Sequence, residues 1–309
     1  MKTVLAFAVL ALLAAPVTAR EAKPVIAITF DDLPAHSALP PGTTRVEVAR
    51  QTIKAFTDER VEVYGFVNGG QIAREPESAA VLEMWRAGGL PLGNHGWRHL
   101  NLNEVSVADY VADIDQTAAL IGPKMAGKDW HWFRYPYLAE GDDPAKRLEV
   151  RKALAERHYR IAAVSMSFGD YMWNEPYARC VALGDRAAIA TLEESYLRIA
   201  AETARATRAD ARALYGRDIP YVLLMHIGAL DARLLPRLLR QYRDEGFDFT
   251  TLGKAEADPV FAADVDPGLP PAPARWEQMR ARGILAQPVE NLSAMLDSLC
   301  RSPSTVSAP

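Results

Sequence analysis

Residues 25–32 read VIAITFDD, a nearly continuous apolar run that ends in two adjacent aspartates. Runs of this kind are typical of parallel strands that are buried on both faces. Further strand-like runs follow along the chain, at residues 61–67, 89–93, 130–133, 161–166, 221–226 and 247–250. Segments with helical patterns lie between them, and this alternation of strand and helix predicts a parallel α/β fold.

Several helical segments have visible limits. Ser106 and Asp109 have the spacing of a capping box, so a helix is expected to begin there and to stop at Gly122-Pro123. A second helical pattern runs roughly from residue 78 to 86. Residues 185–215 are rich in Ala, Arg and Glu and contain no Gly or Pro, which fits one long helix or two short ones.

Ionisable side chains follow the ends of the predicted strands. Asp31 and Asp32 come after the first strand, Arg134 after the fourth and Asp170 after the fifth, and His226 ends the sixth. In a barrel of parallel strands these ends converge on one face, whereas a flat sheet would spread them along an edge. The sequence therefore predicts an irregular seven-stranded barrel with its functional site at one end.

The aspartate pair and two histidines point to a divalent metal. Two neighbouring carboxylates repel each other unless a cation or a raised pKa compensates. His95 and His99 are four residues apart, a spacing that places both rings on one side of a helical turn and suits zinc. No glutamate follows His95, so a catalytic base must come from elsewhere, and Asp31 can supply it.

Each motif also has a purely structural explanation. An aspartate pair can cap a helix or a turn, and Arg134 before Tyr-Pro-Tyr fits a strand that is stopped by proline. Asp170 after Gly169 fits a turn, and a histidine that ends a buried strand is often a satisfied core residue. His36 and His131 lie beside the motifs and are further candidates for the cleft.

The composition limits the partners. Hydrophobic residues make up 49% and charged residues 24% of the chain, which are values of a globular protein. The net charge of -4 argues against a nucleic-acid or anionic-membrane partner, because both call for a basic face. The oligomeric state stays open.

The N-terminal residues suggest export. Residues 1–19 have a basic start at Lys2, a short apolar run and a small-residue cleavage site at residues 17–19, as signal peptides do. The alternative is an uncleaved anchor, but a spanning helix needs about 20 apolar residues. We therefore expect a periplasmic or secreted protein that is not inserted in a membrane after the signal peptide is removed.

The remaining chain divides in two. Residues 20–256 are expected to form the barrel, and residues 257–309 a Pro-rich linker with an accessory segment and a helix near residues 290–300. The two cysteines, Cys180 and Cys300, fit either a disulfide, which export permits, or two unpaired thiols.

Taken in order, five segments resemble the motifs of the polysaccharide deacetylases of carbohydrate esterase family 4, the NodB-homology fold. They are TFDD (29–32), HGWRH (95–99), RYPY (134–137), Asp170 with a nearby Trp, and LLMH (223–226). The resemblance implies a distorted seven-stranded (β/α) barrel. It also implies metal-dependent removal of acetyl groups from N-acetylated sugars, with some members of the family acting on O-acetylated xylan.

The resemblance implies roles for the residues nearest the chemistry. Asp32, His95 and His99 would bind the metal. Asp31 would be the general base that takes a proton from metal-bound water, the nucleophile. His226 would be the general acid that protonates the leaving amine. Zinc is the expected metal, and cobalt, nickel or manganese also suit this donor set.

The resemblance also implies supporting roles. Arg134 and Asp170 would pair to hold and tune Asp31. The backbone N–H of Tyr137 would stabilise the oxyanion, and Leu224 would line the pocket for the acetyl methyl group.

Three positions depart from the family's usual pattern. Leu33-Pro34 follows the aspartates where glycine is common, and Gly96 stands where Ser or Thr is usual. Tyr171 follows Asp170 where Trp is usual, with Trp173 two residues further on. None of these changes removes a metal ligand, the base or the acid, but they leave the shape of the groove and the substrate open.

The sequence predicts a hydrolase of carbon–nitrogen bonds other than peptide bonds, acting on an N-acetylated glycan. One alternative is an O-acetyl esterase of the xylan type or a small-amide hydrolase on the same fold. A non-catalytic glycan-binding module is the alternative from another class. Binding alone needs neither a base nor an acid, which favours the enzyme.

Overall fold

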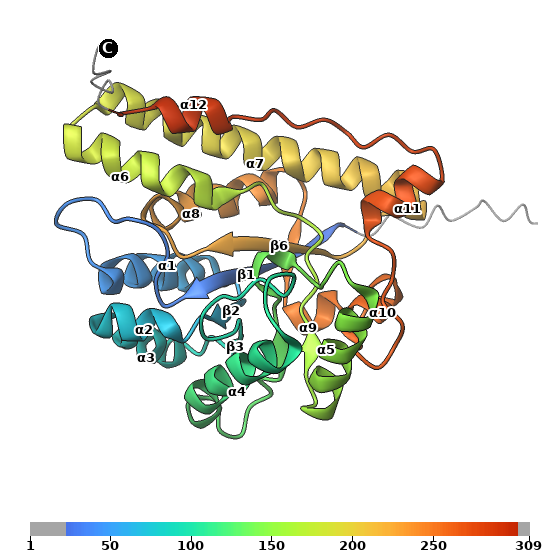
Figure 1. Cartoon of the computed structure of the whole chain (residues 1–309). Coiled ribbons are helices and arrows are strands. Elements are labelled where there is room, and N and C mark those ends of the chain that lie inside the picture. The colour runs from blue at the N-terminus through green and yellow to red at the C-terminus, as the bar shows by residue number, and fades with distance from the viewer. Residues whose placement is uncertain (1–22, 302–309) are drawn as a thin grey trace, which may run out of the picture.

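The computed structural model describes residues 23–301, so the predicted signal peptide at residues 1–19 lies outside the described part. Parallel strands form the centre of the molecule and helices surround them (Figure 1). The strands are β1 (Val25–Leu33), β2 (Val63–Val67), β3 (Leu92–Asn94), β4 (Trp132–Phe133), β5 (Arg160–Ile161), β6 (Tyr221–His226) and β7 (Asp248–Thr250). These strands confirm the predicted parallel α/β fold.

β1 pairs with three other strands, β2, β6 and β7. The strand order is β5-β4-β3-β2-β1-β6, and β7 pairs with the first residues of β1. All residues of β1 after Val25 are buried, which is why this strand is apolar almost throughout. In the pairing with β6, Asp31 lies opposite His226, so two of the sequence motifs end side by side.

The sheet curves into an irregular barrel because the chain after β5 crosses to β6. Met166 forms an isolated parallel bridge with Leu223 of β6. The sequence predicts one strand over 161–166, but its regular pairing with β4 ends at Ile161, since the residues that follow leave β4 for β6. This crossing is the irregular part of the barrel.

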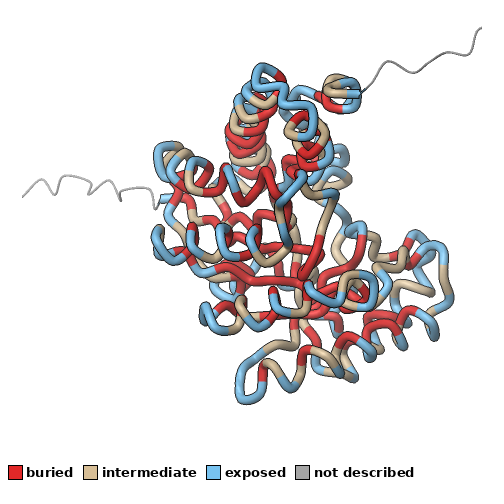
Figure 2. Tube along the Cα trace, turned by 90° about the vertical axis from the view of Figure 1, so that its left-hand side faces the viewer, coloured by how far each residue is buried: buried red, intermediate tan, exposed pale blue. Residues whose placement is uncertain are grey.

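The helices cover the sheet on several sides, with α6, α7 and α12 forming an outer layer beyond α8 (Figure 1). They are α1 (Arg45–Glu59), α2 (Gly70–Arg74), α3 (Ala79–Ala87), α4 (Val107–Lys124), α5 (Pro144–Glu156), α6 (Asn174–Leu183), α7 (Arg186–Tyr215), α8 (Ala229–Asp244), α9 (Leu252–Ala255), α10 (Ala262–Val265), α11 (Arg275–Ala281) and α12 (Ser293–Ser298). Residues 185–215 thus give one long helix. Buried residues follow the strands and the inner sides of the helices (Figure 2).

Helix α4 begins as predicted but ends later. The hydroxyl of Ser106 accepts a hydrogen bond from the backbone N–H of Asp109, which caps the first turn. Pro123 does not stop the helix. Proline has no backbone N–H, and at this position in the last turn only one helical hydrogen bond is lost. There Met125 donates its N–H to the carbonyl of Ile121, so the final turn is still held.

The C-terminal segment folds back on α6 and is tied to it by a disulfide between Cys180 and Cys300. The Arg179 guanidinium donates to the backbone carbonyls of Leu296 and Leu299. Of the two options for the cysteines, the disulfide is therefore the correct one. The helix in this segment, α12, is shorter than the predicted 290–300, and the domain boundary after residue 256 remains our proposal.

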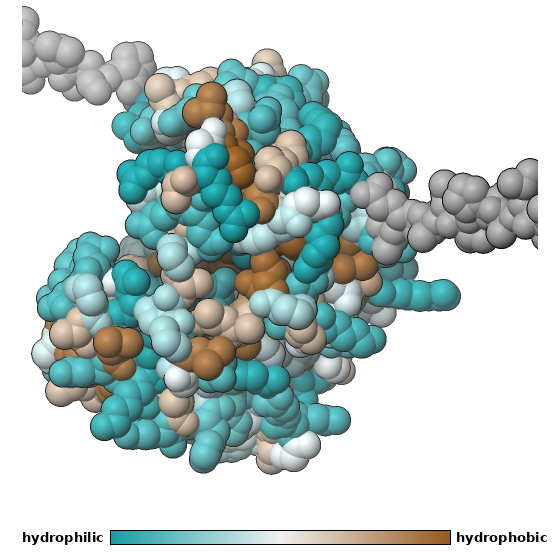
Figure 3. All heavy atoms as spheres, turned by 90° about the vertical axis from the view of Figure 1, so that its right-hand side faces the viewer, coloured by the Kyte–Doolittle hydropathy of each residue, from teal (hydrophilic) through white to brown (hydrophobic). Residues whose placement is uncertain are grey.

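One face of the described chain is mostly hydrophilic (Figure 3). On the face in Figure 3, hydrophobic residues form small patches between hydrophilic side chains. Within residues 23–301, no helix combines the length and the apolar character that crossing a bilayer would require.

Removing the disulfide is expected to destabilise the protein. The bond closes a loop with a sequence separation of 120 residues, and losing it raises the conformational entropy of the unfolded chain. The Cys180→Ala, Cys300→Ala double variant should lose about 2–4 kcal/mol of unfolding free energy. Urea unfolding measures the loss, and the wild type in reductant is the matched control. Equal midpoints for all three samples would contradict this account.

Candidate active site

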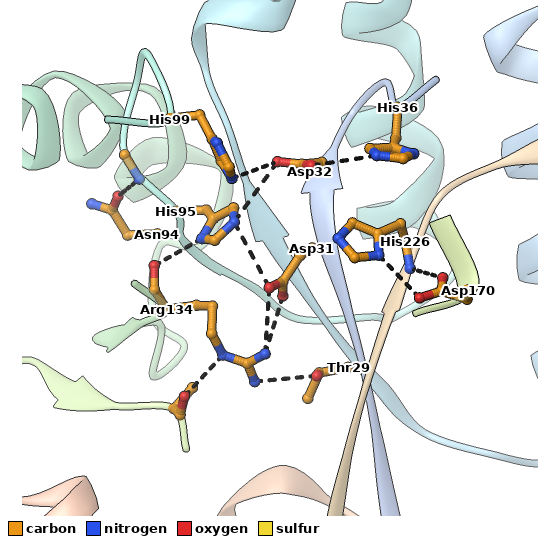
Figure 4. Close-up of polar contacts among 12 residues, drawn as sticks. Thr29, Asp31, Asp32, His36, Asn94, His95, His99, Arg134, Asp170 and His226 are labelled. Atoms are coloured by element: carbon orange, nitrogen blue, oxygen red, sulfur yellow. Dashed lines mark hydrogen bonds and ion pairs between the residues drawn. The ribbon is translucent and has the colours of Figure 1, made fainter. Parts of the chain in front are cut away.

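A cavity of about 420 Å³ opens where β1 and β6 end. Seven of the nine residues predicted for the site line it, and Arg134 and Asp170 lie behind it, each in contact with one of the seven (Figure 4). The lining residues are Asp31, Asp32, His36, His95, His99, Tyr137, Leu138, Ser167, Tyr171, Leu224 and His226. The sequence motifs therefore meet in one place.

The two aspartates at the end of β1 share this cavity but differ in their partners. Adjacent residues of a regular strand point to opposite faces of the sheet. Asp32 has a φ of 59°, and the register with β2 shifts between Phe30 and Leu33, so the strand is irregular here. This irregularity lets both carboxylates reach the cavity.

Asp32, His95 and His99 fit a divalent metal. Oδ1 of Asp32 lies 3.7 Å from Nε2 of His95 and 3.5 Å from Nε2 of His99. Ligand atoms of all three residues lie within 4.8 Å of one another. Oδ1 is buried and has no hydrogen-bond partner within residues 23–301, an unfavourable state that a cation would relieve. One carboxylate and two imidazoles suit zinc and neighbouring divalent metals.

The protonation states also suit a metal. Burial raises the pKa of Asp32, but the surrounding histidines lower it by more, so its pKa lies below the ordinary value. Burial lowers the pKa of His99, despite the opposing effect of Asp32. Near neutral pH the carboxylate is then ionised and the imidazole neutral, the forms that bind metals.

The two histidines lie in a loop after β3, and our expectation of a helical turn is wrong. Gly96 has a φ of 73° and His99 a φ of 56°, both in the left-handed region. A Cβ on Gly96 would lie 2.8 Å from Oδ2 of Asp113, so a side chain would meet that carboxylate. A sharply turned loop, instead of a helical repeat, brings the rings together.

Asp113 on α4 holds this loop, a role that was not predicted from the sequence. Its carboxylate accepts hydrogen bonds from the backbone N–H groups of Trp97 and Arg98 and from Nε of Arg98. These hydrogen bonds tie the loop to α4. An acidic residue among the buried positions of α4 was the available signal.

His95 is held in the orientation a ligand needs. Nδ1 of His95 lies 2.7 Å from the backbone carbonyl oxygen of Arg134. A carbonyl only accepts, so Nδ1 carries the proton and Nε2 keeps its lone pair toward Asp32. Hydrogen bonds of this kind are usual behind metal-binding histidines.

Arg134 contacts Asp31 but not Asp170, so the predicted pairing of Arg134 with Asp170 is wrong. Nη1 of the fully buried guanidinium lies 3.4 Å from both carboxylate oxygens of Asp31. Its other nitrogens donate to the carbonyl of Ala162 and the hydroxyl of Thr29. The guanidinium thus joins β1 to the residue that follows β5.

Asp170 instead pairs with His226. Its Oδ2 accepts the backbone N–H of His226 at 2.6 Å, and its Oδ1 lies 3.1 Å from Nδ1 of the ring. Burial lowers the pKa of His226, but the charge of Asp170 and its hydrogen bond raise it by more, to about 9. An imidazolium that keeps its proton at neutral pH can act as an acid.

A family model described as polysaccharide deacetylase matches residues 18–154. Over this segment, which is less than half of its length, the chain is similar to polysaccharide deacetylases. The matched segment contains Asp31, Asp32, His95, His99 and Arg134, whereas Asp170 and His226 lie beyond it. A search of curated proteins found no match.

Solved structures of carbohydrate esterase family 4 share the fold. A family 4 pseudoenzyme mutant with restored activity is 15% identical, with a TM-score of 0.54 over 76% of this chain and 68% of its own. The wild-type pseudoenzyme is from Bacillus anthracis. The Xyl-CE4 domain of a multidomain xylanase from the Trinervitermes trinervoides hindgut metagenome is 15% identical, with a TM-score of 0.52 over 76% and 91%. A chitin deacetylase from Colletotrichum lindemuthianum is 18% identical, with a TM-score of 0.52 over 81% and 89%.

Tyr137 and Leu224 also lie at the cavity. Tyr137 has a φ of 60°, is 66% exposed, and its ring centroid is 4.4 Å from that of His99. Leu224 is buried on β6. Tyr171 lines the rim, whereas Trp173 is buried and donates its indole N–H to Ser195. Tyr171, which stands where the family usually has Trp, is therefore the residue at the cavity.

His36 is a further histidine of the cavity, and His131 does not line it. His36 follows the aspartates in the loop after β1, and its ring centroid is 4.7 Å from that of His226. Burial, and then the charge of His226, lowers the pKa of His36 to about 4. It is thus neutral beside a protonated neighbour.

The pH dependence of the activity should show the effect of Asp170 on the pKa of His226. If the acid form of His226 is required, activity falls as pH rises through a pKa of about 9. Asp170→Asn removes the charge that raises this pKa, so the basic limb of kcat/KM should move down by about 1 pH unit or more. Profiles over pH 5–10 for both proteins measure the shift. An unmoved limb would show that another group causes it.

Proposed function

We propose that this chain is a metal-dependent hydrolase that removes acetyl groups from an N-acetylated sugar or polysaccharide. One observation carries the proposal. The Asp32, His95 and His99 triad shares one cavity with a buried carboxylate, Asp31, and with a histidine of raised pKa, His226. Amide hydrolysis needs a base that takes a proton from water and an acid that protonates the leaving amine, and residues suited to both roles line one cavity.

Asp32, His95 and His99 would hold the metal. When bound, a zinc ion would lower the pKa of a water molecule and polarise the acetyl carbonyl. Cobalt, nickel and manganese remain alternatives, because this donor set does not discriminate strongly among them.

Asp31 is the proposed general base. Asp31 is 2% exposed, and its carboxylate points toward Arg134, which limits its movement. It would take a proton from the attacking water. Arg134 acts only through Asp31 and is therefore a positioning residue.

His226 is the proposed general acid. Asp170 holds Nδ1, which leaves Nε2 to face the cavity and to protonate the leaving nitrogen. The backbone N–H of Tyr137 would donate to the oxyanion, a role in which one donor commonly accounts for about 100- to 1,000-fold in rate. Leu224 would contact the acetyl methyl group, because it is the apolar residue that β6 places on the cavity.

The substrate and the location are part of the proposal. Tyr137 and Tyr171 expose aromatic surface at the rim, which suits the apolar faces of sugar rings. The disulfide supports an exported, periplasmic or secreted protein, as the predicted signal peptide does.

The test is acetate release from N-acetylglucosamine oligomers, peptidoglycan and acetylated xylan by zinc-loaded protein. Release from the amino-sugar substrates, lost after chelation and restored by zinc, is the expected result. Release from xylan alone would make the chain an O-acetyl esterase. A protein that binds one zinc ion and the glycan but releases no acetate would be a non-catalytic module, and the proposal would be wrong.

A further inference from the structure

Asp32 presents its two carboxylate oxygens to two different sets of histidines (Figure 4). Oδ1 faces Nε2 of His95 and of His99, at 3.7 and 3.5 Å. Oδ2 faces Nε2 of His36 on the other side, at 3.9 Å. A carboxylate with nitrogen donors beside both of its oxygens can bridge two divalent ions, as two-metal enzymes illustrate.

His226 completes the second set of donors. Ligand atoms of Asp32, His36 and His226 all lie within 4.8 Å of one another. Two ligands of one zinc ion each lie about 2 Å from it, and so at most about 4 Å from each other. Small side-chain shifts would therefore bring this second triad onto one ion.

The outer nitrogens of both rings are already occupied. Nδ1 of His226 lies 3.1 Å from Oδ1 of Asp170, and Nδ1 of His36 lies 2.7 Å from Oγ of Ser37. His95, in the first triad, is held in the same way by a backbone carbonyl. Metal-binding histidines are oriented by such contacts, so His36 and His226 have the arrangement of ligands.

We infer that Asp32, His36 and His226 form a second divalent-cation site, and that an ion bound there inhibits the enzyme. The inhibition rests on the proposed function: an ion on Nε2 of His226 prevents this atom from giving a proton to the leaving amine. The binding of the ion does not rest on it.

The charge of the cavity makes the second site the weaker one. The cavity and the residues directly behind it carry three carboxylates, those of Asp31, Asp32 and Asp170, which exceed the positive charges of Arg134 and of protonated His226 by one. A first divalent ion makes the net charge positive, so a second ion is repelled, must displace the proton of His226 and must share Asp32. The second site should therefore fill only at excess metal.

Zinc binding by the metal-free protein tests the site directly. Equilibrium dialysis against increasing zinc chloride should give one tight zinc ion and a second, weaker one in the wild type. His36→Phe should keep only the tight ion, and His99→Phe should lose it. His131→Phe is the matched control, because this histidine lies outside the cavity, and it should bind zinc as the wild type does.

The rates test the inhibition. For each protein the rate at excess zinc is divided by its own rate at one equivalent, so that differences in basal activity cancel. This ratio should fall by about 100-fold in the wild type at saturation, the scale of losing a general acid. It should stay near one in His36→Phe. Anomalous diffraction from wild-type crystals soaked in excess zinc should show a second peak beside His36.

The outcomes separate the two proposals. One zinc ion in the wild type, lost in His99→Phe, with no second peak, would overturn the second site and leave the proposed function standing. A second ion retained by His36→Phe would also overturn it. No zinc bound by any of the proteins would overturn the metal-dependent function as well.

Discussion

Replacing Asp31 with Asn should lower kcat by about 1,000-fold, within the range for losing a general base. The amide in this variant would keep the shape of the side chain but would not accept a proton from water. The effect should fall on kcat more than on KM, because the carboxylate is proposed to act in the chemical step. Steady-state acetate release with the wild type and the variant measures it.

The contrast with Asp32→Asn makes the result specific. Asp31→Asn should keep its zinc, whereas Asp32→Asn should lose both zinc and activity, since Oδ1 of Asp32 faces the two histidines. Zinc content by atomic spectrometry separates the two. A rate within about 10-fold of the wild type for Asp31→Asn would assign the base to another residue.

Replacing Arg134 with Met should cost about 3–5 kcal/mol of unfolding free energy, the usual cost of removing one partner from a buried ion pair. The guanidinium is fully buried and the side chain of Asp31 is 3% exposed, so the remaining carboxylate would be left without its counter-ion. The activity of the folded fraction should also fall, by about 10- to 100-fold, as Asp31 loses its orientation. Urea unfolding and kcat per folded molecule are the measurements.

Arg151→Met is the matched control for this variant. Arg151 is equally buried, but it donates to the carbonyls of Ala263, Asp266 and Leu269, away from the cavity. This change should destabilise the fold without lowering kcat of the folded protein. If Arg134→Met and Arg151→Met lose stability equally and both keep full kcat, Arg134 has a structural role only.

The residues around the cavity could be predicted because they stand at the ends of strands. Continuous apolar runs predict buried parallel strands, and residues at the ends of such strands meet on one face of a barrel. Asp31, Asp32 and His226 were found in this way. The partners of these residues were harder to predict: Arg134 pairs with Asp31 and not with Asp170, and Asp170 pairs with His226.

The loop of His95 and His99 shows why local spacing was insufficient. A separation of four residues places two side chains on one side of a helix, but His95 and His99 lie in a loop. Two residues with a left-handed backbone and the carboxylate of Asp113 from α4 shape this loop. His36 was a candidate for the cleft with no motif behind it. Its place opposite His226 depends on how the loop after β1 lies against β6.

The sequence by itself determined the order of strands and helices, the side chains at the strand ends and the residue types that suit a metal. These features can be predicted because they depend on the pattern of polar and apolar residues within short segments of the chain. Only the tertiary structure decided that Asp170 pairs with His226, that Cys180 bonds Cys300 and that Asp32 faces histidines on both sides. Such contacts join residues far apart in the chain, and their distances follow from how the barrel closes and packs.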